Sequence, residues 1–434
     1  MNVALAKTET GRAVNSVFAV ARERLPGSGK VADVRAQAFE AFERAGLPNR
    51  RIEEWKYTDL RALMREVLPL APAPDADAIK RARTALKTAG VKGATRLVLV
   101  DGVFAAELSD AAESGVIVKT LRQALEGGES HLLSTDASDA MIALNAAMAT
   151  DGVLISVTDG ANLVHPLQVI HVATAAKTSI FTRSHLTIGN GARVTLIESF
   201  VAADGAKAYQ ANDMVILSVG DGAELSHVRL MADSTDAANI SSGIFTVGAK
   251  AEYNLFNMTS GGALSRFSGF VTLKGEASDI NVNGVNLLKG TQHGDTTLVV
   301  DHAVPHCTSR EIFRAVVDDR AHSVFQGRII VRPHAQKTDG KMMTRALLLS
   351  DEAEADNKPE LEIFADDVTC GHGATSGALD ESLLFYLRAR GLPEKEAQAL
   401  LIQAFVGEAI EGIANDDLRE AAMAVAQRWL EARA

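Results

Sequence analysis

Short apolar runs that follow glycine turns recur along the middle of the chain. Residues 191–197, Gly-Ala-Arg-Val-Thr-Leu-Ile, resemble residues 222–228, Gly-Ala-Glu-Leu-Ser-His-Val, and looser copies begin at Ala251, Ala277 and Ala321. The first copies are spaced roughly 26 to 31 residues apart, which is within the range of solenoid turns. Each such turn can bury small and branched side chains and bond its backbone to the next turn. The pattern therefore predicts a stack of short strands.

No amphipathic helix pattern separates the short strands between residues 97 and 368, which disfavours a doubly wound α/β sheet. Runs such as residues 97–100 and 153–157 are apolar or alternating, and glycine, Asp and Asn turns divide them. A large antiparallel sandwich is the alternative. We favour a mainly β fold whose core is a right-handed parallel β-helix (solenoid), flanked by N-terminal and C-terminal α-helical regions.

Helical periodicity marks both ends of the chain. Residues 33–68 indicate helices, with Asp33 as a candidate N-cap, and a proline-containing linker follows at residues 69–77. Residues 379–429 are again helical in pattern, and Asn415 is a candidate N-cap of the last helix. The expected domains are an N-terminal helical region and linker (1–92), a β-helix core (93–369) and a C-terminal helical domain (370–434).

The C-terminal helices carry apolar residues beyond one stripe. Five residues share a face at helical spacing: Ala397, Leu400, Leu401, Ala404 and Phe405. Val406 and Ile410 lie off that stripe. A helix with more than one apolar face often has a partner in another chain, and burial within its own domain is an equally good explanation.

Composition restricts the function. The net charge is -11 and aromatic residues make up 5%, which disfavours nucleic acid and stacked sugars as partners. Two cysteines cannot form a disulfide framework. No apolar run reaches membrane-spanning length, and residues 1–24 lack the apolar segment of a secretory signal. We expect a cytoplasmic protein that binds neither nucleic acid nor a membrane.

Glycine tracts that resemble phosphate loops are incomplete. Near residues 27–30, Arg24 replaces the first glycine of a P-loop and Val31 replaces its Ser or Thr. The tracts at residues 189–191 and 220–222 lack the last glycine of a dinucleotide fingerprint and precede strands. We expect no nucleotide in this chain, so any ATPase activity belongs to a partner.

The most informative chemical groups lie in residues 365–379. Cys370 and His372 are two residues apart, and Gly371 and Gly373 would let the backbone bend so that both side chains point the same way. Thiolate and imidazole both bind iron. A third ligand from another chain would complete a split metal site. The alternative is a buried small residue beside a hydrogen-bonded histidine. A cysteine hydrolase fits less well, because nothing nearby resembles an oxyanion hole.

His302, His306 and Cys307 form a second tract. On one strand, the two histidines would share a face and Cys307 would point the other way. That arrangement disfavours a three-ligand site, and we interpret the tract as a core cysteine beside solvated histidines.

Residues 301–413 resemble the SufB/SufD family of iron–sulfur cluster assembly proteins. The resemblance is carried by Asp301-His302 with Cys307 and Ser309, and by residues 324–329, 335–339, 347–351, 358–363, 365–375 and 384–388. Glu-Trp-Lys-Tyr at residues 54–57 matches an N-terminal motif of the family. In its low cysteine content and its short N-terminal helical region, the chain resembles the SufD branch of the family more than the SufB branch. Gly371 departs from the family, because many relatives carry Ser there.

The resemblance implies a non-catalytic scaffold subunit of a SufBCD complex. It implies a β-helix that pairs with SufB and C-terminal helices that dock the SufC ATPase, whose ATP-driven dimerisation would shift the SufB–SufD interface. His372, with Cys370 as the second candidate, would hold transient iron or an iron–sulfur cluster shared with SufB. An isolated chain could also form a homodimer, and flavin binding by the complex is left open. The alternative function is a β-helix enzyme acting on polysaccharide.

Overall fold

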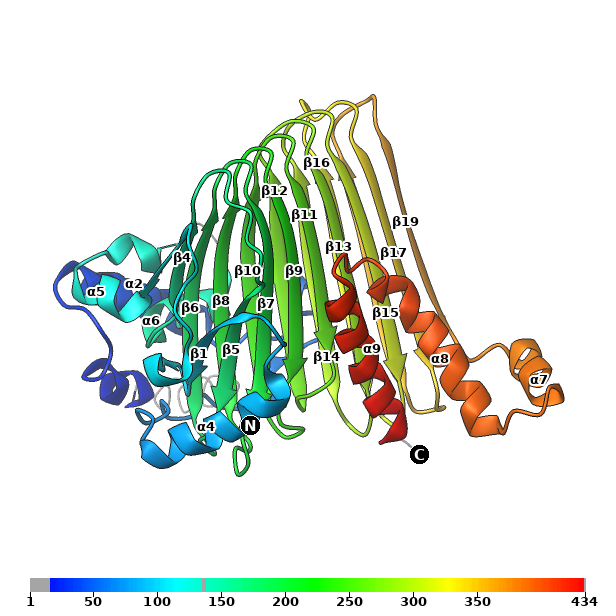
Figure 1. The fold of residues 1–434 in the computed structure, drawn as a ribbon, viewed down its shortest axis with the longest axis horizontal. Helices are drawn as coiled ribbons and strands as arrows, with labels where there is room; N and C mark the ends of the chain where they lie inside the picture. The colour runs from blue at the N-terminus through cyan, green and yellow to red at the C-terminus, as the bar shows by residue number, and fades with distance from the viewer. Residues whose placement is uncertain (1–15, 135–137, 433–434) are drawn as a thin grey trace.

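The computed structural model describes residues 16–134 and 138–432. It is a parallel β-helix of about 8 turns with helices at both ends (Figure 1). This confirms the predicted fold class over the antiparallel sandwich. Most of the N-terminal stretch that lacks a signal-like segment lies outside the described residues.

Two sheets form the walls of the β-helix. Sheet I contains β1 (Thr95–Val100), β2 (Val103–Phe104), β5 (Leu167–Ala173), β7 (Arg193–Ala202), β9 (Glu224–Ala232), β11 (Glu252–Thr259), β13 (Asp279–Leu288), β15 (Thr308–Val317), β17 (Asp339–Leu348) and β19 (Thr369–Gly377). Sheet II contains β3 (Val116–Thr120), β4 (Val153–Val157), β6 (Ser179–Ile188), β8 (Gln210–Val219), β10 (Ala238–Val247), β12 (Leu264–Leu273), β14 (His293–His302), β16 (His322–Val331) and β18 (Glu354–Ile363). Successive strands along the coils alternate between the two sheets.

The predicted repeats form stacked turns. The Oδ1 atom of Asp159 accepts from the amide of Asn190, Asn190 Oδ1 accepts from Asp221, and Asp221 Oδ1 accepts from Ala249, at 2.7–2.8 Å. Each side chain therefore bonds to the corresponding turn one coil further along. Such a ladder ties neighbouring coils together, and it explains why these glycine tracts precede strands rather than helices.

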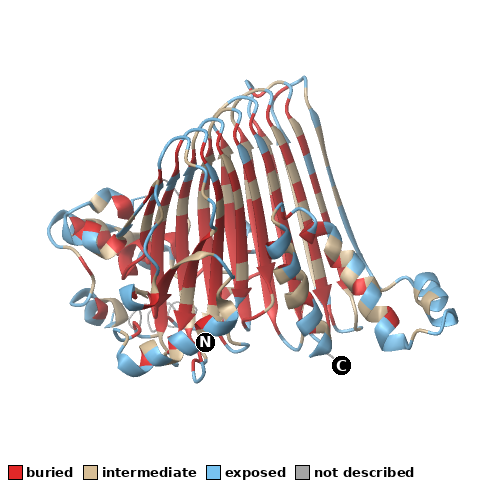
Figure 2. Ribbon diagram, viewed as in Figure 1, coloured by how far each residue is buried: buried red, intermediate tan, exposed pale blue. Residues whose placement is uncertain are grey.

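The core lies in the lumen between the two sheets. One continuous cluster of buried apolar residues runs through it, and the rings of Phe313 and Phe325 meet across the walls with centroids 4.4 Å apart. Figure 2 shows that strands in the middle of the stack are largely buried, whereas β19 is exposed or intermediate along its length. The last coil is more exposed because no further coil covers it.

Helices cover the N-terminal end. They are α2 (Lys30–Ala45), η1 (Glu53–Trp55), α3 (Leu60–Leu63), α4 (Ala76–Ala89), η2 (Ala106–Leu108), α5 (Leu121–Glu126), η3 (Ser130–Leu133) and α6 (Ala140–Met148). Helix α2 begins at Lys30 behind Gly29, so the predicted N-cap at Asp33 is wrong, and Asp33 lies in the first turn where a negative charge favours the helix dipole. The linker is held at Leu70, which bridges to Ser179.

The C-terminal helices are α7 (Glu381–Ala389), α8 (Glu394–Ile410) and α9 (Asp416–Glu431). Helices α8 and α9 pack on the outer face of sheet I (Figure 1). The side chain of Asn415 caps α9 as predicted. Val406 and Ile410, which lie off the predicted stripe, are buried, whereas Leu400 is 46% exposed. Because α8 is apolar on several sides, periodicity alone does not select its packed face.

The β-helix strands continue to Gly377, past the boundary expected at residue 369. The last strand is rich in glycine and lacks apolar alternation, so its sequence does not indicate a strand. Backbone pairing with β17 holds it in place. Among the helices of the described ranges, none combines the length and the apolar character needed to cross a membrane.

Candidate functional site

The predicted Cys370–His372 pair lies on β19, at the C-terminal end of the β-helix. Among the strands of residues 16–134 and 138–432, β19 pairs only with β17 in sheet I and β18 pairs only with β16 in sheet II, so the last coil has two free strand edges. Residues 369–377 pair in register with residues 339–347. The predicted glycine bend is therefore wrong: the pair lies in extended backbone, because β17 provides a complete ladder for it.

Both side chains lie on the lumen side of β19. Alternation along a strand puts residues 370 and 372 on one face, and Cys370 packs against the lumen cluster. Gly373 faces outward, where an added Cβ would come 2.6 Å from Met343 Cε. Cys370 is partly buried and His372 is exposed. A thiol and an imidazole thus stand at the rim where the lumen opens.

Two lumen rows lead back from this rim: Cys370–Gly340–Ser309 and His372–Met342–Glu311. A spacing of about 4.8 Å between paired strands puts Ser309 and Glu311 roughly 10 Å behind the rim. Gly340 contributes no side chain to the first row, and an added Cβ there would lie 3.4 Å from Ser309 Oγ. The thiol is therefore separated from the polar groups of β15 by a row position without a side chain.

The pKa of Cys370 is raised above its usual value. Burial is the main cause, and the carboxyl groups of Asp339 and Glu311 add to it, while the backbone amide of Gly340 opposes it. At neutral pH Cys370 is therefore a thiol, and a nearby cation would favour its thiolate form. The exposed imidazole of His372 can reach a ligand outside the chain. The pair is suited to a metal that arrives from outside.

No group of three or more His, Cys, Asp or Glu side chains is arranged to hold a metal ion in residues 16–134 and 138–432. Cys370 and His372 supply two candidate ligands. Iron and zinc sites in proteins commonly use four or more ligands. A metal held at this rim would therefore need ligands from another molecule.

The second tract is not one strand. Strand β14 ends at His302, and the chain turns at His306, which has φ 62°. Cys307 is fully buried, with Sγ 3.3 Å from Ser278 Oγ, which agrees with a core cysteine. His306 is exposed as expected, but His302 is buried and its Nε2 lies 3.0 Å from Ser309 Oγ. The prediction of solvated histidines is therefore wrong for His302.

Glu311 was not identified as a functional residue from the sequence. It is fully buried on β15, and neither carboxyl oxygen has a hydrogen-bond partner. Burial raises the pKa of Glu311 to about 8, and Ser309 and Arg310 oppose this shift. The available signal was a glutamate at the same alternation phase as Phe313, within an otherwise strand-like run.

A cluster of buried charges toward the N-terminal half of the lumen was also missed. Glu198 accepts hydrogen bonds from Arg229 Nε at 2.8 Å and lies 2.8 Å from His227 Nε2. Burial would raise the pKa of Glu198, but Arg229 and His227 outweigh it and hold the value at about 2. These groups are mutually paired, as buried charges must be.

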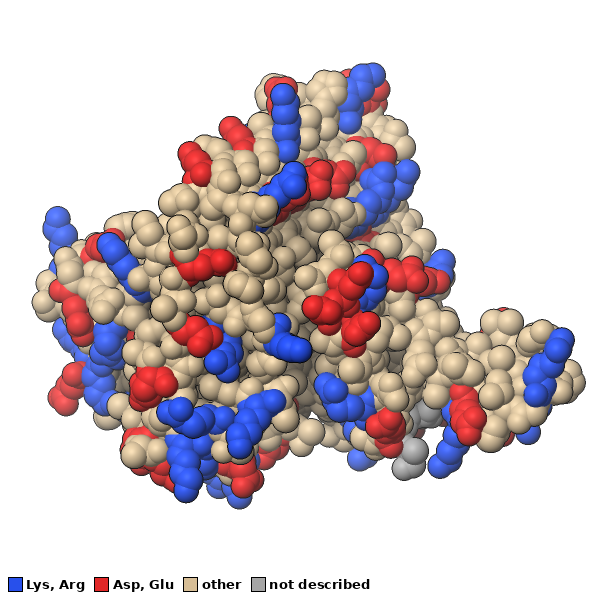
Figure 3. Space-filling model, in the orientation of Figure 1, with Lys and Arg blue, Asp and Glu red and all other residues tan. Residues whose placement is uncertain are grey.

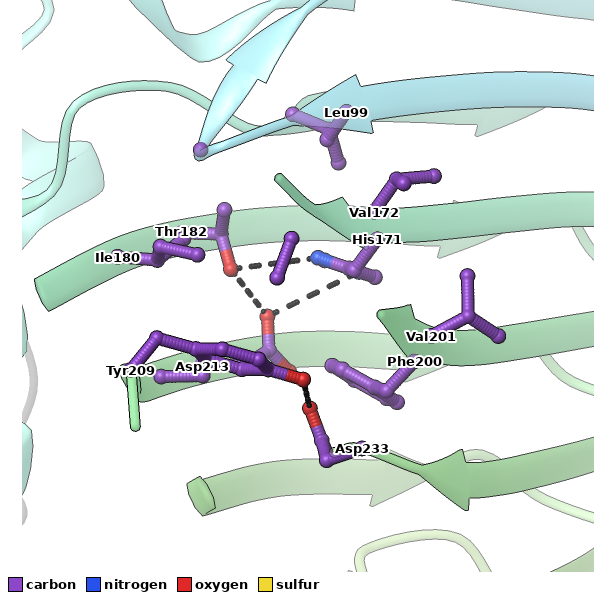
Figure 4. A pocket seen from close by; sticks show the side chains of 13 residues that line it. Leu99, His171, Val172, Ile180, Thr182, Phe200, Val201, Tyr209, Asp213 and Asp233 are labelled. Carbon is purple, nitrogen blue, oxygen red and sulfur yellow. Dashed lines mark hydrogen bonds and ion pairs between the residues drawn. The ribbon is translucent and has the colours of Figure 1, made fainter. Parts of the chain in front are cut away.

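A small cavity adjoins this cluster (Figure 4). Thr182 donates to Asp213 at 2.8 Å, and His171 Nε2 lies 4.0 Å from Asp213 Oδ1 without a hydrogen-bond partner. The space open to the centre of a water molecule is ≈ 20 Å³, enough for about one water. This interior cluster is sealed from the rim by several coils.

Comparison with known proteins agrees with the family motifs identified in the sequence. The model described as "SUF system FeS cluster assembly, SufBD core domain" matches residues 171–405, and "SufBD protein N-terminal region" matches residues 25–169. The chain is 32% identical over 392 residues to the iron–sulfur cluster assembly protein SufD of Escherichia coli, covering 89% of this chain and 90% of that one.

Two further relatives extend the likeness. A SufBD family protein of Synechocystis is 30% identical, covering 85% of this chain and 84% of its own length. SufD of Bacillus subtilis is 26% identical, covering 66% of each chain. The predicted resemblance, including its likeness to SufD, is confirmed. The chain belongs to the SufB/SufD family of the SUF system for iron–sulfur cluster assembly.

Proposed function

We propose that this chain is the SufD-type scaffold subunit of a cytoplasmic complex with SufB and the SufC ATPase. In this proposal His372, assisted by Cys370, holds iron or a nascent cluster at the contact with SufB. The observation that carries the proposal is the Cys/His pair at the rim of an uncovered coil.

The free edges of β18 and β19 support a partner at this end. Unpaired strand edges offer a row of backbone donors and acceptors to a strand from another chain. Ile363 and Phe364, at the end of β18, are 41% and 59% exposed and add apolar contact area. A SufB β-helix that added strands here would cover the rim, and it would bring its own ligands next to His372. A second copy of this chain could use the same edges when SufB is absent.

The SufC contact is proposed on α7. This helix has no buried residue, and it projects from the body of the molecule (Figure 1). Leu383, Phe385 and Tyr386 are 51%, 74% and 54% exposed. An apolar surface of this kind is typical of a protein interface. By contrast, Figure 3 shows acidic and basic side chains interspersed over the face that carries α4, α8 and α9, as on an ordinary solvated surface.

The proposed chemistry is ligand exchange. Imidazole and thiolate both bind iron, and a partly exposed site with mixed ligands suits a cluster that must later leave. ATP-driven dimerisation of SufC would move the C-terminal helices, and through α8 it would move sheet I. We propose no ATPase activity in this chain, because its glycine tracts lack the essential residues of a phosphate loop.

Co-expression with SufB and SufC tests the proposal. We expect one complex that contains all three chains, identified by its mass in native mass spectrometry. Leu383→Glu should remove SufC alone. Thr369 donates its backbone N–H toward β17, so by alternation Ala374 presents its N–H at the free edge, and Ala374→Pro should remove SufB alone. Recovery of this chain free of both partners, under conditions in which SufB and SufC associate with each other, would contradict the proposal.

A further inference from the structure

Glu311 lies on the lumen face of β15. It alternates with Ser309 and Phe313, and the Phe313 ring meets Phe325 of the opposite sheet. Its register neighbours are Val282 on β13 and Met342 on β17, which are both apolar and buried. The carboxyl group is 0% exposed. Glu311 is therefore a carboxyl group in the apolar core, one row position behind Met342 and two behind His372.

Ser309 and Arg310 favour a negative charge on Glu311, but burial outweighs them. Neither oxygen has a hydrogen-bond partner, and the hydroxyl of the nearby Ser309 is 3.0 Å from His302 Nε2. The guanidinium of Arg310 turns outward and binds Asp339 Oδ2 at 2.7 Å. A buried carboxyl group without a partner is far more stable when protonated.

The titratable and charged groups around Glu311 come from each neighbouring element: His302 and Cys307 at the end of β14 and its turn, Arg310 on β15, Asp339 and Lys341 on β17, and Cys370 and His372 on β19. His302 is neutral at pH 7, because burial lowers its pKa to about 4. Burial is the main cause of the raised pKa of Cys370, and Glu311 also contributes to it.

We propose that Glu311 carries a proton in the resting chain and releases it to solvent when a divalent metal cation binds at the Cys370–His372 rim. The step converts a carboxylic acid and a cation into a carboxylate facing that cation, plus one free proton, and no electron is transferred. The identity of the cation as iron rests on the proposed function. Glu311 is a positioning residue here, because Met342 separates it from the rim and it does not touch the metal.

Distance and charge make the coupling large enough to matter. A divalent charge about 10 Å away, at an effective dielectric constant of about 20, lowers a carboxyl pKa by roughly 2 units. From a starting value of about 8, Glu311 then ionises at neutral pH when the rim is occupied. By linkage, its ionisation strengthens metal binding about tenfold at pH 7 and only about twofold at pH 6.

The first experiment detects the proton in the isolated chain without metal. Infrared difference spectra between the wild type and Glu311→Gln should show the C=O stretch of a protonated carboxyl group at pH 6.5, and the band should disappear as pH rises through about 8. Glu362→Gln, an exposed glutamate on β18, is the matched control and should not change the band. Absence of the band at pH 6.5 would overturn the inference, whatever the metal does.

The second experiment titrates the complex of this chain, SufB and SufC with Co²⁺ as the probe, by calorimetry in buffers of different ionisation enthalpy. Relative to the wild type at pH 7, Glu311→Gln should bind about tenfold more weakly and release about one proton fewer per metal, and the affinity gap should narrow at pH 6. Equal affinity and proton release would overturn the coupling. If His372→Ala leaves Co²⁺ binding unchanged, the proposed function fails, and the infrared band still decides whether Glu311 holds a proton.

Discussion

The two ends of the β-helix differ in what covers them. At the N-terminal end, helices α2, α5 and α6 pack over the first coils and bury their apolar residues within the chain. The guanidinium of Arg35 closes that packing by donating to the carbonyl oxygens of Pro26, Ala147 and Ala149 at 2.9–3.3 Å. Within the described residues, the edge strands are β2 and β3 at the N-terminal end, where α5 contacts β3, and β18 and β19 at the C-terminal end, where β19 is exposed or only partly buried along its length.

The difference in covering supports the proposal that a partner binds at the C-terminal end. Solenoids need their terminal coils capped, and free strand edges invite pairing with other chains. The N-terminal cap comes from this chain's own helices. At the C-terminal end, α8 and α9 cover the outer wall of sheet I and leave the rim open. The rim also carries Cys370 and His372, so the uncovered coil and the candidate ligands coincide.

The largest expected effect on stability comes from a substitution at the N-terminal end of the β-helix, which its helices cover and which we call the closed end; the C-terminal end is the open end. Arg35→Ala leaves three buried carbonyl oxygens without their donor, at about 1–3 kcal/mol for each unpaired group. We expect the free energy of unfolding to fall by roughly 3–5 kcal/mol in urea titrations. Arg44→Ala, an exposed arginine on the same helix, should change it by less than about 0.5 kcal/mol. Equal midpoints for the two variants would mean that the cap does not depend on Arg35.

An intermediate effect is expected from pH. Burial lowers the pKa of His185, near the closed end, and of His302, toward the open end, to about 4 each. Each histidine is therefore neutral in the folded chain, while the unfolded chain takes up a proton below about pH 6.5. The contribution of each neutral histidine to the unfolding free energy is fully present above that pH. It is lost as pH falls toward 4, by at most about 1.4 kcal/mol per pH unit for each histidine.

The matched variants His185→Gln and His302→Gln sharpen the comparison of the two ends. Both should flatten the fall in unfolding free energy below pH 6.5 by similar amounts, as measured by urea titration at several pH values. A flattening by His185→Gln alone would mean that water enters from the open end as far as His302, and that the lumen is less dry there than at the closed end.

A smaller effect on stability, with loss of binding, is expected from α7. Leu383→Glu combined with Phe385→Glu should change the unfolding free energy by less than about 0.5 kcal/mol, because both side chains are exposed. SufC affinity, measured by calorimetry, should fall by at least about 100-fold, since each apolar anchor contributes about 1.5–3 kcal/mol when buried. Ile117→Glu, an exposed apolar residue at the closed end, should leave SufC binding intact.

Point substitutions are preferable here to removal of the C-terminal helices. Helices α8 and α9 bury Val316 and Leu347 of sheet I, so a truncation would expose the outer wall of the β-helix. Loss of SufC binding could then follow from misfolding. Unchanged SufC affinity in the double α7 variant would place the contact elsewhere.

The repeated features of the fold were predictable from sequence. The β-helix repeats one local pattern, so copies such as residues 191–197 and 222–228 report the same turn and strand many times. The cap at Asn415 depends on neighbouring residues only and was predicted correctly, whereas the cap predicted at Asp33 is wrong. Cys370 and His372 could be selected as candidate ligands because their side-chain chemistry is distinctive and their spacing is local.

Features set by contacts between coils could not be predicted. Glu311 faces Val282 and Met342 only after the coils have stacked, and no local pattern gives that register. The pairing of Glu198 with Arg229 likewise joins two strands through the lumen. Strand β19 has almost no apolar alternation, and it is recognised as a strand only by its backbone register with β17.

The most direct test of the account is cluster formation by the complex of this chain, SufB and SufC after His372→Ala. Thr375→Ala, on the opposite face of β19, is the matched control. Both variants should assemble the complex with unfolding free energies within about 0.5 kcal/mol of the wild type, because the substitutions are exposed. After reconstitution with iron and sulfide, the visible absorption of the cluster should be largely lost in His372→Ala, less reduced in Cys370→Ala and unchanged in Thr375→Ala. Full cluster absorption in the His372→Ala complex would contradict the assignment of the open rim as the assembly site.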